Sequence, residues 1–335
     1  MRKRNHYVPQ FYLSYFLSDH EKELLWVYDK VSLGSRQQTP LNTAVEGHLY
    51  TITHPDGTKD DFIEKEVFTP HEGIAKPILD RWQMPGHRIT AQEIDDISMF
   101  LALLHARVPR NLALQDEITT ATVVEALKEL AEDDARFTKN YESYKAKSGD
   151  TDILSPEECR QFLRDPERHC KIIPPDLLSL AFNLWATDMT RDVLHKLNWS
   201  LCDAPRGSRF ITCDSPLVSF VETRPGFARF GCSFLSPNLE ISFAVSPDVC
   251  LYLQSQKRQK RWRCGLEAVE EFNRRAICMS ERFVFASFRS RRIERLVREF
   301  AFTASTPKLN RKDFHKEYAR YRQEGEFDLF DITDS

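Results

Sequence analysis

Residues 241–253 read ISFAVSPDVCLYL, two apolar runs separated by the turn residues Ser246-Pro247-Asp248. Apolar runs of this length, rich in β-branched and aromatic residues and divided by a turn signal, are typical of two adjacent strands. The stretch therefore predicts a strand pair, residues 241–245 and 249–253. It places a sheet in the C-terminal half of the chain.

Further strands are expected around this pair. Residues 199–202 and 209–213 flank Ala204-Pro205-Arg206-Gly207, a pattern that favours a β-hairpin. Another apolar run near residues 283–286 predicts a strand between two helices, at about residues 266–279 and 291–300.

The N-terminal half is mainly helical in pattern. Thr90 and Glu93 form a capping box ahead of a helical apolar face that ends near Val108. Residues 61–82 and a long stretch from Asp176 to about 197 show the same periodicity. We therefore expect an α+β fold, with a helical N-terminal half packed on a mainly antiparallel sheet that is formed largely by the C-terminal half.

The 335 residues fit one large domain with attachments. Residues 133–175 are charged, weakly periodic and rich in proline, which predicts a helical connector. Residues 301–335 are polar and aromatic and are expected to form a C-terminal extension. The domain prediction is therefore a single α+β domain over residues 1–300.

Composition and cysteine spacing favour a cytoplasmic protein. No window approaches the roughly 18 uninterrupted apolar residues of a membrane helix, and the basic N-terminus lacks the apolar run of a signal peptide. The eight cysteines form no C-x-x-C pair, which fits a reducing compartment. The motifs of Rossmann dehydrogenases, P-loop NTPases, zincin proteases and α/β-hydrolases are absent from the sequence.

Three places in the sequence combine polar groups that could carry chemistry. His6 and Gln10 lie in an aromatic opening segment, where His6 could act as an acid, a base or a metal ligand. Asp214 follows an apolar strand, a place where a scaffold fixes a carboxylate and leaves it accessible. The structural alternatives are an N-terminus that simply packs on the core and an Asx turn at Asp214.

Glu72 is the third candidate, because it lies eight residues after Glu64 on a predicted helix and could join a divalent-metal site. A solvated acidic face is the alternative explanation. Arg107 and Arg110 follow at a helix end, where they could grip an anion or complement the helix dipole.

The C-terminal half contains a strongly basic region. Between residues 255 and 298, thirteen Lys or Arg stand against five Glu, a local charge of +8 in a chain of formal net charge −3. Its densest part is the basic strip, residues 257–263, which suits phosphate contacts with base stacking on an embedded tryptophan. A solvated, salt-bridged surface is the alternative. The strip's candidate binding residues are Lys257, Arg258, Lys260, Arg261, Trp262 and Arg263.

The opening HYVPQFYL, residues 6–13, resembles the signature of domain-of-unknown-function family 4238. The resemblance extends to Arg107-x-Pro-Arg, to residues 210–216, to Ser246-Pro247-Asp248 and to Asn273. It implies no established activity. It does imply that the matching polar residues converge on one pocket: His6, Arg107, Arg110, Asp214 and Asn273.

These observations lead to a hypothesis and two alternatives. The chain is expected to be a hydrolase or transferase on nucleic acid or another phosphate-bearing substrate. Asp214 and His6, with Glu72, would hold a divalent metal or act as base, and Arg107 and Arg110 would neutralise phosphate charge. The alternatives are a non-catalytic module that binds nucleic acid or protein through the basic strip, and a purely structural protein partner.

Overall fold

The computed structural model describes residues 4–53, 56–148, 153–169, 178–224, 227–231, 234, 236–256 and 260–301. The chain divides into two compact units. Unit 1 consists of residues 1–113 and 180–307, and unit 2 consists of residues 114–179 and 308–335. The separate unit therefore begins earlier in the sequence than the expected connector at about 133–175.

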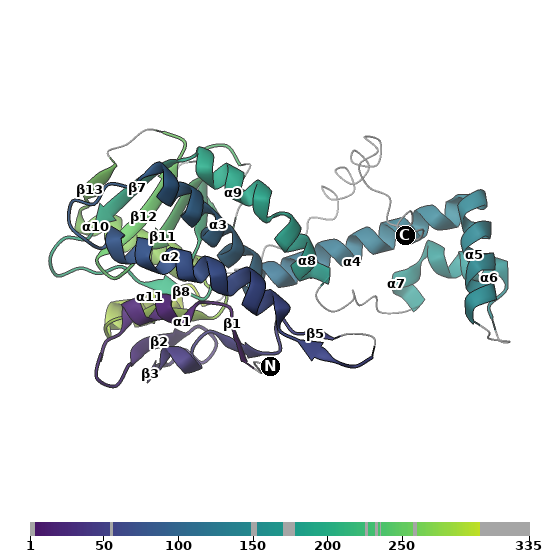
Figure 1. Ribbon diagram of the computed structural model, residues 1–335, viewed down its shortest axis with the longest axis horizontal. Coiled ribbons are helices and arrows are strands. Elements are labelled where there is room, and N and C mark those ends of the chain that lie inside the picture. The colour runs from purple at the N-terminus through teal and green to yellow at the C-terminus, as the bar shows by residue number, and fades with distance from the viewer. Residues whose placement is uncertain are drawn as a thin grey trace. The chain divides into compact units, whose positions relative to one another are not determined.

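Unit 1 is built on a six-stranded sheet with the strand order β10-β9-β11-β12-β7-β13. Figure 1 labels its strands β11, β12, β7 and β13. All neighbours are antiparallel except β13, which runs parallel to β7. Ala244 of β11 lies opposite Cys250 of β12, which confirms the strand pair predicted from residues 241–253. The strands are β7 (Asn198–Asp203), β9 (Val218–Arg224), β10 (Phe227–Phe230), β11 (Glu240–Ala244), β12 (Val249–Gln254) and β13 (Arg261–Arg263).

Both faces of this sheet are covered by helices. Tyr252 of β12 packs edge-to-face on Phe272 of α10 (Leu266–Met279), with ring centroids 5.5 Å apart. Phe243 of β11 points to the opposite face and contacts Phe100 of α3 (Ala91–Arg107). Successive side chains of a strand alternate between the two faces of the sheet, and helices cover both faces, so every residue of β12 is buried. Its sequence is accordingly a continuous apolar run apart from Gln254.

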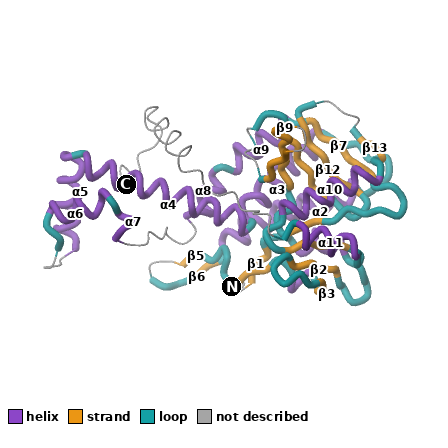
Figure 2. The backbone as a smooth tube through the Cα atoms, turned by 180° about the vertical axis from the view of Figure 1, so that it is seen from behind, coloured by secondary structure: helices purple, strands orange, loops and turns teal. Residues whose placement is uncertain are grey.

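A second sheet has the strand order β3-β2-β14-β8, with all pairs antiparallel. It combines two strands from the N-terminal half of the sequence with two from the C-terminal half. Val284 lies between Tyr28 of β2 and Cys213 of β8. Figure 2 shows these strands with the rest of the sheet structure in orange. The strands are β2 (Leu25–Asp29), β3 (Ser35–Gln38), β8 (Thr212–Cys213) and β14 (Phe283–Ala286).

The hairpin predicted for residues 199–213 is wrong, because β7 belongs to the first sheet and β8 to the second. The intervening segment does not turn back on β7. Instead the amides of Ala204 and Phe210 donate to the carbonyls of Asp248 and Pro247, at 2.9 and 2.7 Å. The segment therefore follows the β11–β12 turn and carries the chain from one sheet to the other.

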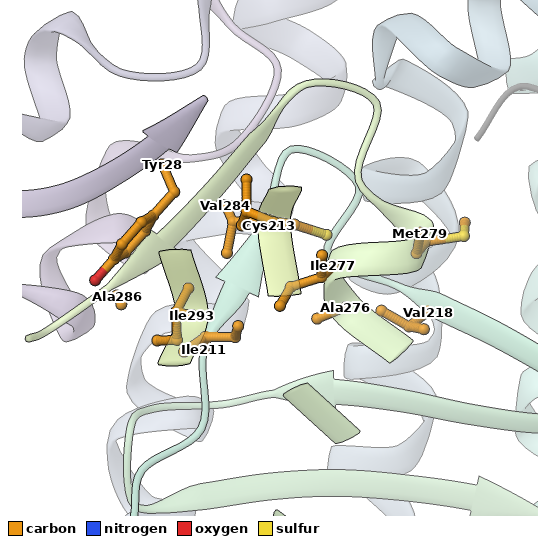
Figure 3. Packing of buried hydrophobic residues seen from close by; sticks show 11 residues of the cluster. Tyr28, Ile211, Cys213, Val218, Ala276, Ile277, Met279, Val284, Ala286 and Ile293 are labelled. Atoms are coloured by element: carbon orange, nitrogen blue, oxygen red, sulfur yellow. The ribbon is translucent and has the colours of Figure 1, made fainter. Parts of the chain in front are cut away.

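A hydrophobic cluster packs the second sheet against α10 and α11 (Arg291–Glu299) (Figure 3). Its centre includes Cys213, Ile277 and Val284, each fully buried. This cluster fixes the helices α10 and α11 relative to β14, and the two helices supply one side of the site described below.

The predicted helix that follows Thr90 is confirmed. Thr90 and Glu93 form the expected capping box of α3, and the helix ends at Val108. The segment 61–82 forms a π-helix, η3 (Ile63–Phe68), followed by α2 (Thr69–Trp82). The long helix predicted to reach residue 197 is instead two helices, α8 (Leu178–Trp185) and α9 (Thr187–Lys196), and its expected cap Asp176 lies outside the described residues.

The other elements are short or belong mainly to unit 2. The two-stranded pairs are β1 (Arg4–His6) with β4 (Val45–Gly47), and β5 (Ile52–Thr53) with β6 (Lys59–Asp60). The other helices are α1 (Gln10–Leu13), η1 (Ser14–Phe16), η2 (Pro40–Asn42), α4 (Pro109–Glu132), α5 (Asp134–Ser148), α6 (Pro156–Arg164) and α7 (Pro166–His169). No helix in the described ranges combines the length and apolarity needed to cross a bilayer. The α+β class with a mainly antiparallel C-terminal sheet is confirmed.

Candidate anion-binding cavity

Unit 1 contains a cavity of about 700 Å³, here called the arginine cavity. It is bounded by the segment 204–209, the β11–β12 turn, β13, and the helices α10 and α11. Five arginines and three carboxylates line it, a surplus of two positive charges. These charged residues are Arg206, Arg209, Arg261, Arg263, Arg292, Asp203, Asp248 and Glu270.

Two of the five arginines are engaged in ion pairs. Arg261 donates to both oxygens of Asp203, at 2.9 and 2.5 Å, and its third nitrogen donates to the carbonyls of Trp82 and Met84. Arg292 of α11 pairs with Glu270 of α10. Because their charges are compensated within the wall, these arginines shape the cavity more than they attract a ligand.

The other three arginines have no carboxylate partner in the part of the chain that the structure describes. Arg206 and Arg263 are exposed and make no side-chain hydrogen bond there. Arg209 makes one, from Nη1 to the hydroxyl of Ser287 at 3.2 Å. Three guanidinium groups therefore face one cavity with most of their donors available, an arrangement that suits phosphate or carboxylate ligands.

Asn273 lines this cavity, but its amide is occupied by the protein itself. Its Oδ1 accepts the N–H of Ile211 at 3.0 Å, and its Nδ2 donates to the carbonyl of Arg209 at 2.9 Å. The side chain predicted to bind substrate thus fastens the segment that carries Arg206 and Arg209 to helix α10.

The basic strip contributes only part of its residues to the cavity. Arg261 and Arg263 alternate with Trp262 along β13, so the tryptophan points away and packs on Tyr252 at 6.0 Å between ring centroids. Lys260 is exposed outside the lining. Lys257 and Arg258 lie outside the described residues. The aromatic side chain on the cavity wall is Phe288, which the sequence reasoning missed.

His6 and Gln10 lie away from the arginine cavity. The ring of His6 is half-buried, with Nε2 3.1 Å from the carbonyl of Leu41 and Nδ1 3.3 Å from the amide of Gln10. Burial lowers the pKa of His6, and the hydrogen bond to the Leu41 carbonyl opposes this shift, as the Glu72 carboxylate does more weakly. The two candidate residues therefore contact each other, in a setting that fixes the N-terminus onto the segment 40–42.

Glu72 and Arg107 form an ion pair at 2.8 Å. Arg107 is buried, its guanidinium lies over the ring of Phe68 at 4.7 Å, and its carbonyl accepts the hydroxyl of Tyr50. The guanidinium thus ties α3 to α2 and η3. The Glu72 carboxylate compensates the charge of Arg107 through Nη1, and the Nε of Arg107 is buried without a hydrogen-bond partner in the described residues.

Arg110 is also buried, and its Nη1 donates to the carbonyl of Met279 at 2.8 Å. Its guanidinium lies so close to Gly231 that an ideal Cβ at that glycine would be 2.1 Å from Nη2. This position fits a structural brace between the start of α4 and the end of α10, and it does not place Arg110 on the cavity.

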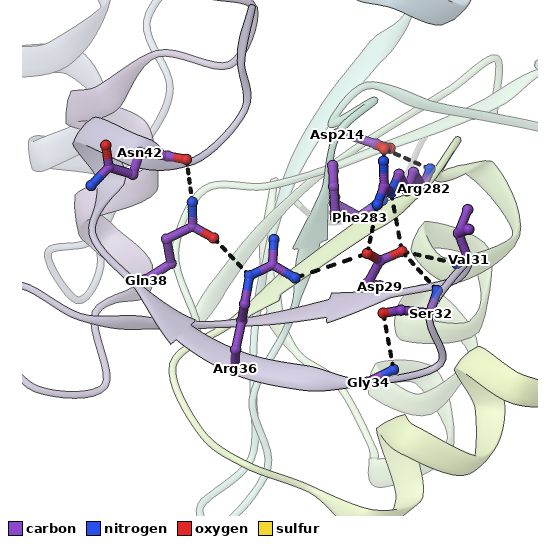
Figure 4. A network of polar contacts seen from close by, with 10 residues as sticks. All are labelled: Asp29, Val31, Ser32, Gly34, Arg36, Gln38, Asn42, Asp214, Arg282 and Phe283. Carbon is purple, nitrogen blue, oxygen red and sulfur yellow. Dashed lines mark hydrogen bonds and ion pairs between the residues drawn. The ribbon is translucent and has the colours of Figure 1, made fainter.

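Asp214 is fully buried at the end of β8. Its oxygens accept the N–H groups of Glu281, Arg282 and Phe283 at 2.7–2.8 Å. Figure 4 shows Asp214 beside Arg282 and Phe283. Burial raises the pKa of Asp214 to about 6, against the lowering effect of these three hydrogen bonds. The carboxylate therefore holds the start of β14, beside the bidentate pair between Arg282 and Asp29.

These contacts do not assemble the predicted metal site. The groups that contact His6 and those that contact Asp214 are different sets, and both Asp214 oxygens are hydrogen-bonded to the backbone. Within the described ranges, no group of three or more His, Cys, Asp or Glu could hold a metal ion. Of the residues expected to converge on one pocket, Asn273 lines the arginine cavity, whereas His6, Arg107, Arg110 and Asp214 do not.

Sequence reasoning missed the cavity residues Arg206, Arg209, Asp248 and Arg292 as site residues. The turn residues in both segments were a sequence signal for this site. Gly207 lies in a turn, where its φ is +85°, and Asp248 lies in the β11–β12 turn. Turn residues on a rigid scaffold are frequent ligand contacts. The sequence did not show that these two turns lie side by side.

Comparison with known proteins gives one match. A family model described as "Protein of unknown function (DUF4238)" matches residues 4–290. No curated protein and no solved structure matches the chain. The matched range includes every described element of unit 1 except α11.

Proposed function

The chain belongs to the family of proteins of unknown function DUF4238, and from this premise and the geometry of unit 1 we propose that it binds a phosphate-bearing ligand in the arginine cavity. The observation that carries the proposal is the set of three arginines, Arg206, Arg209 and Arg263, that face one cavity without carboxylate partners in the described residues. Guanidinium groups match phosphate oxygens in geometry and charge.

Binding is better supported than hydrolysis or transfer. The residues predicted to supply catalysis, His6, Glu72 and Asp214, do not line the cavity and have structural partners. The hydrolase or transferase hypothesis stays a prediction. The proposal therefore follows the binding alternative, with Arg263 of the basic strip joined by Arg206 and Arg209 from the segment 204–209.

Calorimetric titration with inorganic pyrophosphate tests the proposal. The double variant Arg206→Ala/Arg263→Ala should weaken binding at least about tenfold, because it removes two of the three arginines that have no carboxylate partner and leaves Arg209 alone. The matched control is Arg88→Ala/Arg295→Ala, which removes the same charge from exposed positions outside the lining.

The control should bind pyrophosphate like the unaltered protein. Equal weakening of binding in both double variants would show that the loss of affinity depends on net charge and not on position, and this would overturn the proposal. Absence of binding of both pyrophosphate and a nucleoside diphosphate to the unaltered protein would also overturn it.

A further inference from the structure

Asp248 is the feature of the arginine cavity that a simple anion site does not explain. Its side chain is exposed on the cavity wall, and its carboxylate has no ion-pair or hydrogen-bond partner in the described ranges. A lone carboxylate among arginines weakens the attraction for any bare anion. A site for inorganic phosphate alone would gain from its removal.

The backbone holds Asp248 firmly in this position. Its N–H donates to the hydroxyl of Ser246 at 3.3 Å, and its carbonyl accepts the N–H of Ala204 at 2.9 Å. Ser246 and Val249 exchange backbone hydrogen bonds across the turn. The carboxylate is therefore presented to the cavity from a fixed turn and does not reach it from a mobile loop.

A carboxylate only accepts hydrogen bonds, so its ligand must offer donors. An ammonium group is a poor choice, because the lining has a surplus of positive charge. The paired hydroxyls of a ribose are uncharged donors, and a carboxylate that accepts them is the arrangement by which dinucleotide-binding proteins hold the ribose.

Part of the remaining lining is apolar and could contact a base. Val249, Val269 and Ile293 are buried at the cavity wall, and Leu296 and Phe288 are partly buried beside them. Apolar and aromatic surface next to phosphate-binding arginines suits a flat heterocycle, because bases stack on aromatic rings with little dependence on sequence. A cavity of about 700 Å³ lies within the size range of small-molecule sites.

We propose that the arginine cavity takes a ribonucleoside phosphate, with the phosphates on Arg206, Arg209 and Arg263, the ribose hydroxyls on the Asp248 carboxylate, and the base against the apolar wall. This inference rests on the proposed function and narrows it to one class of phosphate-bearing ligand.

The test compares three probes on two proteins by calorimetric titration. The probes are inorganic pyrophosphate, ADP, and ADP that lacks the 2′ and 3′ hydroxyls. The unaltered protein should bind ADP at least about tenfold more tightly than either of the other probes. Asp248→Ala should weaken ADP binding about tenfold, because two hydrogen bonds to a charged acceptor are lost. The same change should leave pyrophosphate binding equal or tighter, because a negative charge has gone.

Asp95→Ala is the matched control, since Asp95 is exposed on α3 and does not line the cavity. It should change none of the affinities. If pyrophosphate binds but the dideoxy probe binds as tightly as ADP, or if Asp248→Ala moves ADP and pyrophosphate in the same direction, the ribose assignment is overturned and the proposed function stands. If no probe binds, both are overturned.

Discussion

The guanidinium of Arg110 lies against Gly231, a contact that only glycine allows. The backbone there has a φ of +64°, and a Cβ would approach the guanidinium to 2.1 Å from Nη2 and 2.9 Å from Cζ. Gly231→Ala should therefore lower the free energy of unfolding by about 1–2 kcal/mol, because alanine is strained at this φ and the guanidinium must shift to make room. Urea denaturation measures this change.

Gly73 provides a control of opposite sign. It lies inside α2 on an exposed position, and an added Cβ would meet nothing within 4 Å. Gly73→Ala should raise the free energy of unfolding by about 0.5–1 kcal/mol. A Gly231→Ala protein that is as stable as the unaltered one would show that Arg110 does not occupy this position.

Asp214 predicts a pH dependence of stability with a defined sign. Its pKa is raised from 3.8 to about 6 in the folded protein, so the folded state holds a proton that the unfolded state releases. The resulting stabilisation is complete below pH 3.8 and is lost as the pH rises through about 6, amounting to about 3 kcal/mol. The charged groups around Asp214 are Lys30, Glu281 and Arg282.

The measurement is urea denaturation of the unaltered protein and Asp214→Asn between pH 4 and 7. Asparagine keeps the shape and one acceptor oxygen but does not titrate, so other carboxylates cancel in the difference. The stability of the unaltered protein relative to the variant should fall as the pH rises. A difference that is constant over this range would contradict the assigned role of Asp214.

At the scale of elements, Asn273 decides where the segment between β7 and β8 lies. Asn273→Ala removes the hydrogen bonds to Ile211 and Arg209 and leaves a buried N–H without its acceptor. We expect a loss of about 1–3 kcal/mol in the free energy of unfolding. Hydrogen exchange of the Ile211 amide should become faster, while the amides of β12 should keep their protection. Unchanged exchange at Ile211 would show that Asn273 does not hold this segment.

The same segment shows where prediction from sequence ends. Local patterns predicted β11, β12, α3, α10 and β14 correctly, because turn residues, a capping box and apolar periodicity are written in neighbouring positions. The hairpin at 199–213 was wrong because the partner of the intervening turn is Asp248, some forty residues later. Pairing between distant strands leaves no local pattern to detect.

At the scale of the whole molecule, the fold class and the family follow from the sequence, whereas the site does not. The arginine cavity gathers residues from position 83 to position 296. The basic region was visible in the sequence as a run of charge. The sequence could not show that Arg261 is paired and Arg263 is not, because the partner of Arg261, Asp203, lies on a strand that is distant in the sequence. The polar residues of the family motifs were visible too, and most of them turn out to hold elements together.

Anion binding in the arginine cavity is tested most directly by the position of a bound oxyanion in a crystal of the protein soaked with tungstate, a heavy phosphate analogue located by its anomalous scattering. We expect a tungstate within hydrogen-bond distance of at least two of Arg206, Arg209 and Arg263, and its absence from crystals of Arg206→Ala/Arg263→Ala. Tungstate bound instead at Arg107 or Arg110, with the arginine cavity empty, would contradict this expectation.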